Sequence, residues 1–160
     1  MIDLYEHDFV RWTEEQARAI REGHLDALDR EHLAEELESM GGNLRREVVS
    51  RLAVIIHHVL KQRVQPDLDG RSWRSTLNVQ RSHIARRLAE SPSLRPYLDD
   101  AFAQALPDGI RSAEIETGIP ADRFELELVT LADALGEDFD ARPQRRGGGR
   151  VREDSLEWRP

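Results

Sequence analysis

The strongest constraint on the fold is a wide apolar stripe in the middle of the chain. Between residues 44 and 64, aliphatic side chains recur every three or four positions: Val48, Leu52, Ile55, Ile56, Val59 and Leu60. This spacing places them on one face of an α-helix, and so wide a face is typical of a helix buried among others. The segment is therefore predicted to be a central amphipathic helix that ends before Gln65 and Pro66.

The remaining segments repeat the helical spacing, and no stretch alternates strictly in the manner of a strand. Helices are expected at 9–22 (capped by Asp8, stopped by Gly23), 27–40 and 73–91 (capped by Ser72). A fifth restarts at the break Ser91-Pro92-Ser93 with Pro96 in its first turn, and others are expected from Pro107 to Gly118 and within 124–139 (capped by Thr130). Gly41 and Gly42 either end or bend the second of these, and Asn43 is a candidate cap for the central helix. The predicted fold class is all-α, a single bundle of about five to seven helices.

Residues 1–140 are expected to form the helical domain and residues 141–160 an Arg/Gly-rich flexible tail, because the tail has no period and contains three consecutive glycines. No apolar run approaches the roughly 20 residues of a membrane helix, and the N-terminus lacks the pattern of a secretory signal. The chain has no Cys, which excludes disulfides, a thiolate nucleophile and Cys-ligated metals. A cytoplasmic protein with no membrane partner is expected.

The net charge of −8 is divided into blocks of opposite sign. Residues 1–40 carry −8, residues 41–96 carry +7, residues 97–140 carry −10 and residues 141–160 carry +3. The basic centre could bind a polyanion such as nucleic acid, but acidic helices packed beside basic ones would give the same pattern. We favour internal pairing, with Glu35, Glu36 or Glu38 facing Arg74, Arg81 or the segment 45–51.

A series of short motifs resembles a bacterial family catalogued as domain of unknown function family 29. The resemblance spans roughly residues 3–140 and rests on Tyr5, Asp8, Phe9, Trp12, the run Leu33 to Gly41, the run His58 to Lys61, Gln65-Pro66, Ser72-Trp73-Arg74 with Thr76, Gln80-Arg81, the run Ser91 to Leu94, and the run Glu116 to Pro120. It implies an all-helical domain with no assigned activity. No catalytic residue can be transferred from it.

One strip of the second expected helix carries metal-ligand types. Asp29, His32 and Glu36 lie at i, i+3 and i+7, and His57 or His58 could complete a carboxylate–imidazole site of the kind found in helical bundles. No second unit of this type exists, and His57 and His58 are expected on opposite sides of the central stripe. We therefore favour a solvated or salt-bridged strip and predict no metal and no cofactor.

A second set of polar residues could line a polar cleft: Glu35, Glu36, Glu38, His58, Lys61, Trp73, Arg74, Gln80 and Arg81. The three glutamates could act as a general acid and base, although surface carboxylates rarely have the tuned pKa values that catalysis needs. Trp73 beside Arg74 could stack on a base, but it is in phase with Leu77 and Ile84 and fits the core better. Gln80 lies in the same apolar seam and requires a hydrogen-bond partner, for which Glu36 is one candidate.

These residues favour a non-enzymatic protein-binding or adaptor module. The alternative is a nucleic-acid-binding protein that uses the Arg-rich centre and tail, and a metal-dependent helical-bundle enzyme is a second alternative. No catalytic residue is assigned.

Overall fold

The computed structural model describes residues 4–66, 70–124, 129–136 and 139. Over these residues the secondary structure is helical, so the predicted all-α fold class is confirmed. The contacts divide the chain into two compact units, one up to Arg46 and one from Glu47 onward. Among the described residues, no helix is both long and apolar enough to cross a bilayer.

The N-terminal unit contains α1 (Leu4–His7), α2 (Phe9–Glu22), a 3-10 turn (Leu25–Ala27) and the beginning of α3 (Arg30–Val64). The side chain of Asp8 accepts a hydrogen bond from the Arg11 amide, and Gly23 ends α2 in the left-handed conformation (φ 75°). Both predicted boundaries of α2 are thus confirmed. A side-chain acceptor satisfies one free amide at the helix start, and glycine adopts positive φ without the steric cost of a Cβ.

Helix α3 decides between the two alternatives left open at the paired glycines, because the helix does not end there. The segments expected as two helices form one continuous helix through Gly41 and Gly42, and Asn43 lies inside it rather than capping it. The oxygen of Asn43 instead accepts a hydrogen bond from Arg46 Nη2 at 2.7 Å. Two glycines together cost only about 2 kcal/mol of helix propensity, which a helix of 35 residues can absorb.

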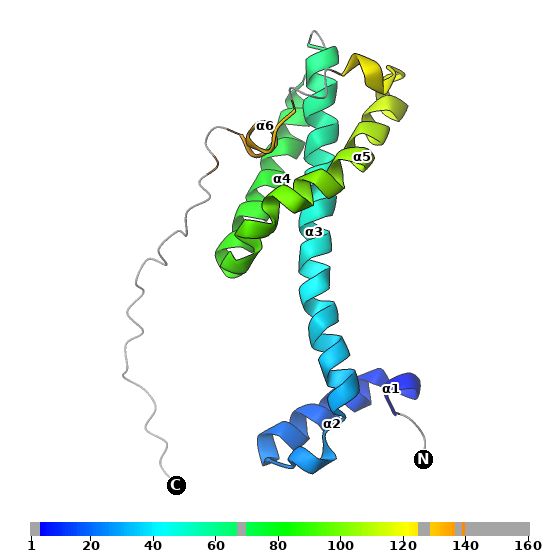
Figure 1. Ribbon diagram of the computed structural model, residues 1–160, viewed down its shortest axis with the longest axis vertical. Helices are drawn as coiled ribbons and strands as arrows, with labels where there is room; N and C mark the ends of the chain where they lie inside the picture. Colours follow the sequence, from blue (N-terminus) through cyan, green and yellow to red (C-terminus); the bar gives the residue numbers. More distant parts are fainter. Residues whose placement is uncertain (1–3, 67–69, 125–128, 137–138, 140–160) are drawn as a thin grey trace, which may run out of the picture. The chain divides into compact units, whose positions relative to one another are not determined.

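The second unit is a bundle built around the C-terminal part of α3. Helices α4 (Arg71–Glu90) and α5 (Leu98–Thr117) pack against it, and the short α6 (Leu131–Leu135) adjoins them (Figure 1). A 3-10 segment (Pro92–Tyr97) joins α4 to α5, and a second one (Ala121–Arg123) follows α5. All six residues of the central stripe are buried, which confirms the predicted face: Val48, Leu52, Ile55, Ile56, Val59 and Leu60.

Three predicted details of this unit are confirmed and two are wrong. Gly118 (φ 69°) ends α5, α3 ends at Val64, and Thr130 caps α6 in a reciprocal capping box with Asp133. Helix α5, however, runs through Pro107, where a new helix was expected. Pro107 is exposed, so the carbonyl left without an amide partner can be hydrated. The cap of α4 is Gly70, without a side-chain hydrogen bond, rather than Ser72.

Helices α3 and α5 approach each other closely at Gly109. A Cβ built on this glycine would lie 2.7 Å from Ile56 Cβ and 3.0 Å from the Ala53 carbonyl oxygen. Because only a hydrogen occupies this space, the two backbones can come within reach of each other where α5 crosses α3 (Figure 1). Gly109 therefore allows α5 to cross α3 at close range.

Candidate functional site

In the N-terminal unit, Asp29 and His32 form a polar cluster with aromatic neighbours. His32 Nδ1 lies 2.7 Å from Asp29 Oδ2, and the Trp12 indole donates a hydrogen bond to the same oxygen at 3.2 Å. The backbone amide of Asp29 donates to Gln16 Oε1 at 2.8 Å. The hydrogen bonds from His32, foremost, and from Trp12 to the Asp29 carboxylate lower the pKa of Asp29.

Tyr5 of α1 connects this pair to Glu36. Its hydroxyl donates to Glu36 Oε1 at 2.8 Å, and its ring stacks on His32 with centroids 3.9 Å apart. The hydrogen bond to Glu36 is the main cause that raises the pKa of Tyr5 to about 12. Two interhelical contacts thus attach α1 and α2 to the beginning of α3, with Asp29 and Glu36 as the acceptors.

Asp29, His32 and Glu36 lie on one strip, as their spacing predicted, but the two carboxylates contact different partners. Asp29 pairs with His32 and Trp12, whereas Glu36 accepts from Tyr5. Within the described ranges, no group of three or more His, Asp or Glu side chains is arranged to hold a metal ion. The arrangement holds helices together through charge-assisted hydrogen bonds.

The second unit contains a buried lysine at the C-terminal end of α3. The Lys61 ammonium forms an ion pair with Glu116 of α5 and lies 4.3 Å from the centroid of the Trp73 ring on α4. Only 5 % of the Lys61 side chain is exposed, so its charge depends on these two groups for stabilisation. Lys61 thereby ties α3 to both α4 and α5. Trp73, which the spacing predicted in the core, is only half-buried.

His57 and His58 adjoin this lysine in an arrangement that corrects the sequence prediction. They were expected on opposite sides of the central stripe, but their rings stack with centroids 4.7 Å apart. His57 Nε2 reaches Glu116 Oε2 at 2.5 Å, so this carboxylate bridges His57 and Lys61.

The electrostatics of the Lys61 cluster follow from burial and charge. The pKa of the Glu116 carboxyl is lowered, mainly because this group accepts a hydrogen bond from the Lys61 ammonium. Burial, followed by repulsion from His57 and Lys61, lowers the pKa of His58. His58 is therefore neutral at pH 7, and the ionised Glu116 balances the buried Lys61.

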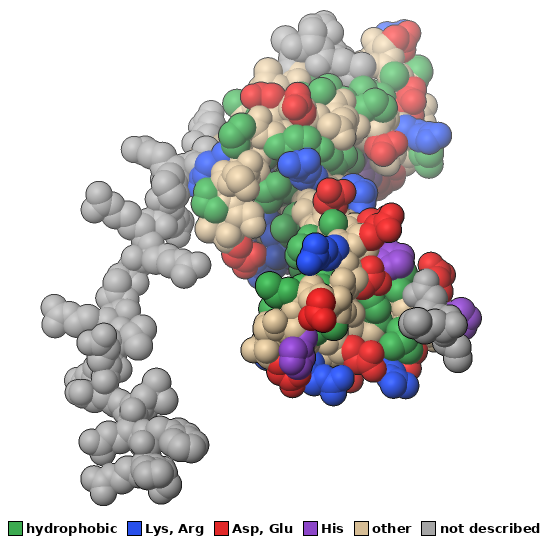
Figure 2. Space-filling model, turned by 60° about the horizontal axis from the view of Figure 1, so that its bottom comes forward, with side chains coloured by type: hydrophobic (Ala, Val, Ile, Leu, Met, Phe, Trp, Pro, Cys, Tyr) green, Lys and Arg blue, Asp and Glu red, His purple; other side chains and the backbone are tan. Residues whose placement is uncertain are grey.

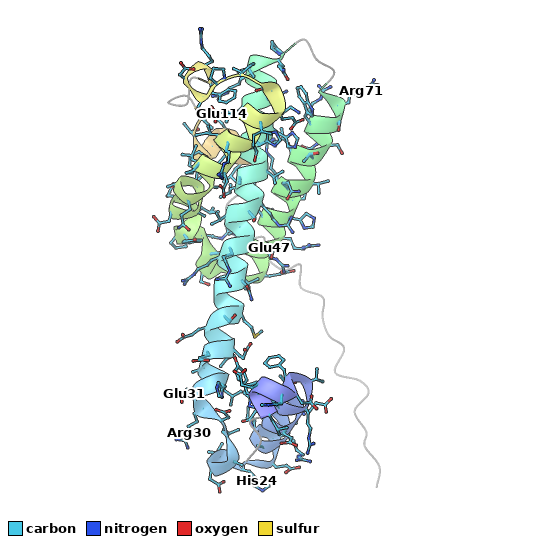
Figure 3. All side chains as sticks on the ribbon, turned by 90° about the vertical axis from the view of Figure 1, so that its right-hand side faces the viewer. His24, Arg30, Glu31, Glu47, Arg71 and Glu114 are labelled. Atoms are coloured by element: carbon cyan, nitrogen blue, oxygen red, sulfur yellow. The ribbon has the colours of Figure 1, made fainter. Side chains whose placement is uncertain are left out.

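A second polar cluster joins α3 to α4 through Glu47, which is labelled in Figure 3. Arg51 donates to Glu47 Oε1 through two nitrogens, at 2.9 and 2.8 Å, and Arg87 Nε donates to the other oxygen at 2.9 Å. Arg51 also donates to Gln80 Oε1 at 2.8 Å. Gln80 thus obtains its hydrogen-bond partner from Arg51, where the sequence suggested Glu36. The two guanidinium groups lower the pKa of Glu47, Arg51 having the larger effect.

Arg81 binds the end of α6. Its Nε donates to the Ala134 carbonyl at 2.9 Å and its Nη2 to the Asp133 carbonyl at 3.0 Å. These oxygens belong to the last turn of a helix, where carbonyls lack intrahelical partners. Arg63 reaches the Asp133 carboxylate at 3.5 Å. Glu116 and Asp133, which lie outside the basic segment 41–96, thus neutralise part of its net charge, and Glu47 within it pairs with two of its arginines.

The residues of the predicted polar cleft are divided among these clusters. His58, Lys61 and Trp73 come together, Gln80 pairs with Arg51, and Arg81 binds α6. Glu35 and Glu38 are exposed in the N-terminal unit, and Arg74 is exposed on α4. A surface depression of about 330 Å³ lies elsewhere on α4, lined by Asn78, Val79, Ser82, His83 and Arg86.

Sequence reasoning missed Tyr5, Glu47, His57 and Glu116 as members of these clusters. A signal for Glu116 was present, because residues 97–140 carry −10 and adjoin the basic segment. The pairing of particular residues across 40 to 55 positions has no local sequence pattern.

The lowered pKa of Glu116 predicts a loss of stability in acid. A carboxyl group whose pKa is lowered by folding stabilises the native state above its unfolded pKa, about 4.3, and this contribution disappears as pH falls through the lower native pKa. The difference in free energy of unfolding between wild type and Glu116→Gln, measured in urea, should therefore be largest near neutral pH and shrink below about pH 4.3. Asp108→Asn, an exposed change on the same helix, is the control. A difference that does not vary with pH would contradict this assignment.

Comparison with known proteins places the chain in one family. No curated protein and no solved structure matches it. The family model described as Domain of unknown function DUF29 matches residues 4–140, which include the Tyr5, Lys61, Glu47 and Arg81 clusters. The match covers most of the chain and agrees with the resemblance of its short motifs, so the protein belongs to the DUF29 family.

Proposed function

We propose that this chain is a non-enzymatic protein-binding module whose binding surface lies on the N-terminal unit. The observation that carries the proposal is the distribution of exposed large apolar side chains. Of the nine among the described residues, six belong to this unit: Phe9, Val10, Ile20, Leu25, Leu37 and Met40. An excess of exposed apolar side chains on one part of a protein is typical of interaction surfaces, whereas single ones are common everywhere.

Helical spacing by itself predicts that several of these side chains face a core. Phe9 and Ile20 share one face of α2 with Trp12, and Leu37 and Met40 share one face of α3 with Leu33, yet the exposed fractions of these four range from 45 to 67 %. On α2 only Trp12 and Ala19 are buried. The helices of this unit therefore carry more apolar side chains on these faces than packing within the unit buries. Such an excess is accounted for when a partner covers the face.

The charged side chains support protein binding over nucleic-acid binding. Arg51 and Arg87 share Glu47, Arg63 approaches Asp133, and Lys61 is buried against Glu116. On the face seen in Figure 2, basic and acidic side chains of the described residues are interspersed. Nucleic-acid binding draws its affinity from unbroken positive surface that releases counterions, and paired arginines contribute little of it.

The test uses the absence of native cysteine, which makes a single introduced thiol a clean reporter. Leu37→Cys reports on the proposed surface, and Ala85→Cys, exposed on α4, is the matched control. Both variants are labelled with a membrane-permeant maleimide, in cells of the native host and as dilute purified protein. We expect Leu37→Cys to react more slowly in cells, relative to Ala85→Cys, because a partner covers it. The same relative rate in cells and in dilute solution would refute the proposal.

A further inference from the structure

Three basic side chains of α3 share one carboxylate in the second unit. His57, His58 and Lys61 lie within two turns near the C-terminal end of this helix. Glu116 of α5 contacts His57 through one oxygen and Lys61 through the other. Both oxygens of the carboxylate are therefore in use, and a positive charge on His58 would be the third cation beside one anion.

The charged groups around His58 belong to two helices. On α3, its ring stacks on that of His57 with centroids 4.7 Å apart, and both His57 and Lys61 repel a positive charge at this position. On α5, Glu116 attracts such a charge, but with a smaller effect than either cation. Helix α4 contributes the uncharged ring of Trp73, which lies 4.3 Å from the Lys61 ammonium. The surroundings of His58 therefore favour its neutral form.

A charged His58 ring would also lack a hydrogen-bond acceptor. Its Nδ1 atom is buried, and no described group forms a hydrogen bond with it. A neutral imidazole can carry its proton on the other nitrogen, whereas an imidazolium has an N–H at both. Protonation in the observed position would thus bury a charged N–H without a partner, which costs considerably more free energy than burying the neutral ring.

We propose that the stacked pair of His57 and His58 is an acid-sensitive switch, which holds the end of α5 against α3 until both rings are charged. Because His58 Nδ1 is buried, a charged ring can reach water only if the neighbouring groups move aside. Glu116 lies one residue before the end of α5 at Thr117, so the packing of α5 on α3 loosens at that end. This inference concerns the second unit and does not depend on the proposed protein-binding surface.

The order of the pKa values sets the direction of the response. Burial, and then repulsion by His57 and Lys61, lowers the pKa of His58 below the value of about 6.5 that histidine has in an unfolded chain. Between these two pKa values the unfolded chain binds a proton that the folded chain does not, so the folded state loses stability as pH falls below about 6.5. The contribution of Glu116 is lost only below about pH 4.3. Measurements between about pH 5 and 7.5 thus separate the two residues.

Urea unfolding of the full-length chain over this pH range tests the switch. At each pH, the unfolding equilibrium constant of the wild type is divided by that of His58→Gln, which cannot be protonated at this position. The ratio should increase by about threefold to tenfold from about pH 7.5 to 5, because only the wild type contains a ring that binds its proton more readily when unfolded. A ratio that does not vary with pH would overturn the proposal.

His24→Gln is the matched control for this substitution. His24 is exposed in the N-terminal unit, and its Nδ1 lies 3.3 Å from Glu22 Oε2. A carboxylate stabilises the protonated form of a neighbouring ring, so the ratio of wild type to His24→Gln should stay level or fall in acid. An increase as large as that for His58→Gln would show that the response does not arise at His58.

Hydrogen–deuterium exchange locates the opening in the wild type. After correction for intrinsic rates, the amides of residues 112–117 should lose protection about threefold or more between about pH 7.5 and 5.5, relative to those of residues 101–106 of the same helix. His58→Phe, which keeps a ring for the stack but takes up no proton, should show no such loss. It also replaces His58→Gln in the urea experiment if circular dichroism shows that variant to be unfolded. Unchanged relative protection in the wild type, or the same loss in His58→Phe, would refute the switch.

Discussion

Replacing Ile56 by Ala is expected to lower the free energy of unfolding by about 2–5 kcal/mol. Ile56 has no exposed surface and lies in the middle of the central stripe, where α5 crosses α3. The loss combines the transfer free energy of the deleted carbons with the cavity that remains, because neighbouring helices can close it only in part. Urea unfolding followed by far-ultraviolet circular dichroism measures the change.

Val54→Ala on the same helix is the control for this substitution. Val54 is 36 % exposed, so its truncation removes less buried surface and should cost well under half as much. A loss below about 1 kcal/mol for Ile56→Ala would show that the helix faces the core with a different side.

Replacing Gly109 by Ala is expected to destabilise the protein by about 1–3 kcal/mol or more, although alanine is the better helix former. The added methyl group would lie 2.7 Å from both Cβ and Cγ2 of Ile56 and 3.0 Å from a backbone oxygen, none of which is the flexible end of a side chain. The two helices must therefore separate. Thermal unfolding of wild type and variant under the same conditions measures the effect.

The same substitution at Gly41 should have the opposite sign. Gly41 also lies inside a helix, but nothing occupies the space within 4 Å of an added Cβ. Gly41→Ala should thus stabilise the protein by roughly 0.5–1 kcal/mol through backbone entropy alone. Because Ile56→Ala removes Cγ2, the cost of Gly109→Ala should fall in that background. Equal effects at the two glycines would refute the close crossing of α3 and α5.

The local sequence was sufficient to predict where most helices begin and end. Asp8, Gly23, Gly118 and Thr130 act at the predicted boundaries, because capping depends on one side chain or one dihedral angle and on neighbours within four residues. The buried face of the central helix was predicted for a similar reason. Its aliphatic stripe is wide enough to specify the helix phase by itself.

The sequence misled where a local helix breaker is overridden by its surroundings. Pro107 was taken as a boundary, and Gly41 and Gly42 as either an end or a bend, yet α3 and α5 continue through them. The propensity cost of each is about 1 kcal/mol for glycine and about 3 kcal/mol for proline. Packing of the remainder of each helix can exceed these costs, and a local pattern contains no information about that packing.

For the polar clusters, the sequence by itself determined the local geometry of the charged residues and the opposite signs of the segments that carry them. The spacing of Asp29 and His32 placed them within one turn, and they are in contact. Only the tertiary structure decided that Glu116 pairs with Lys61 and that Glu47 joins Arg51 to Arg87. From the sequence alone, any acidic residue could neutralise the charge of Lys61. Burial and the helix crossing select the one carboxylate that the buried ammonium can reach.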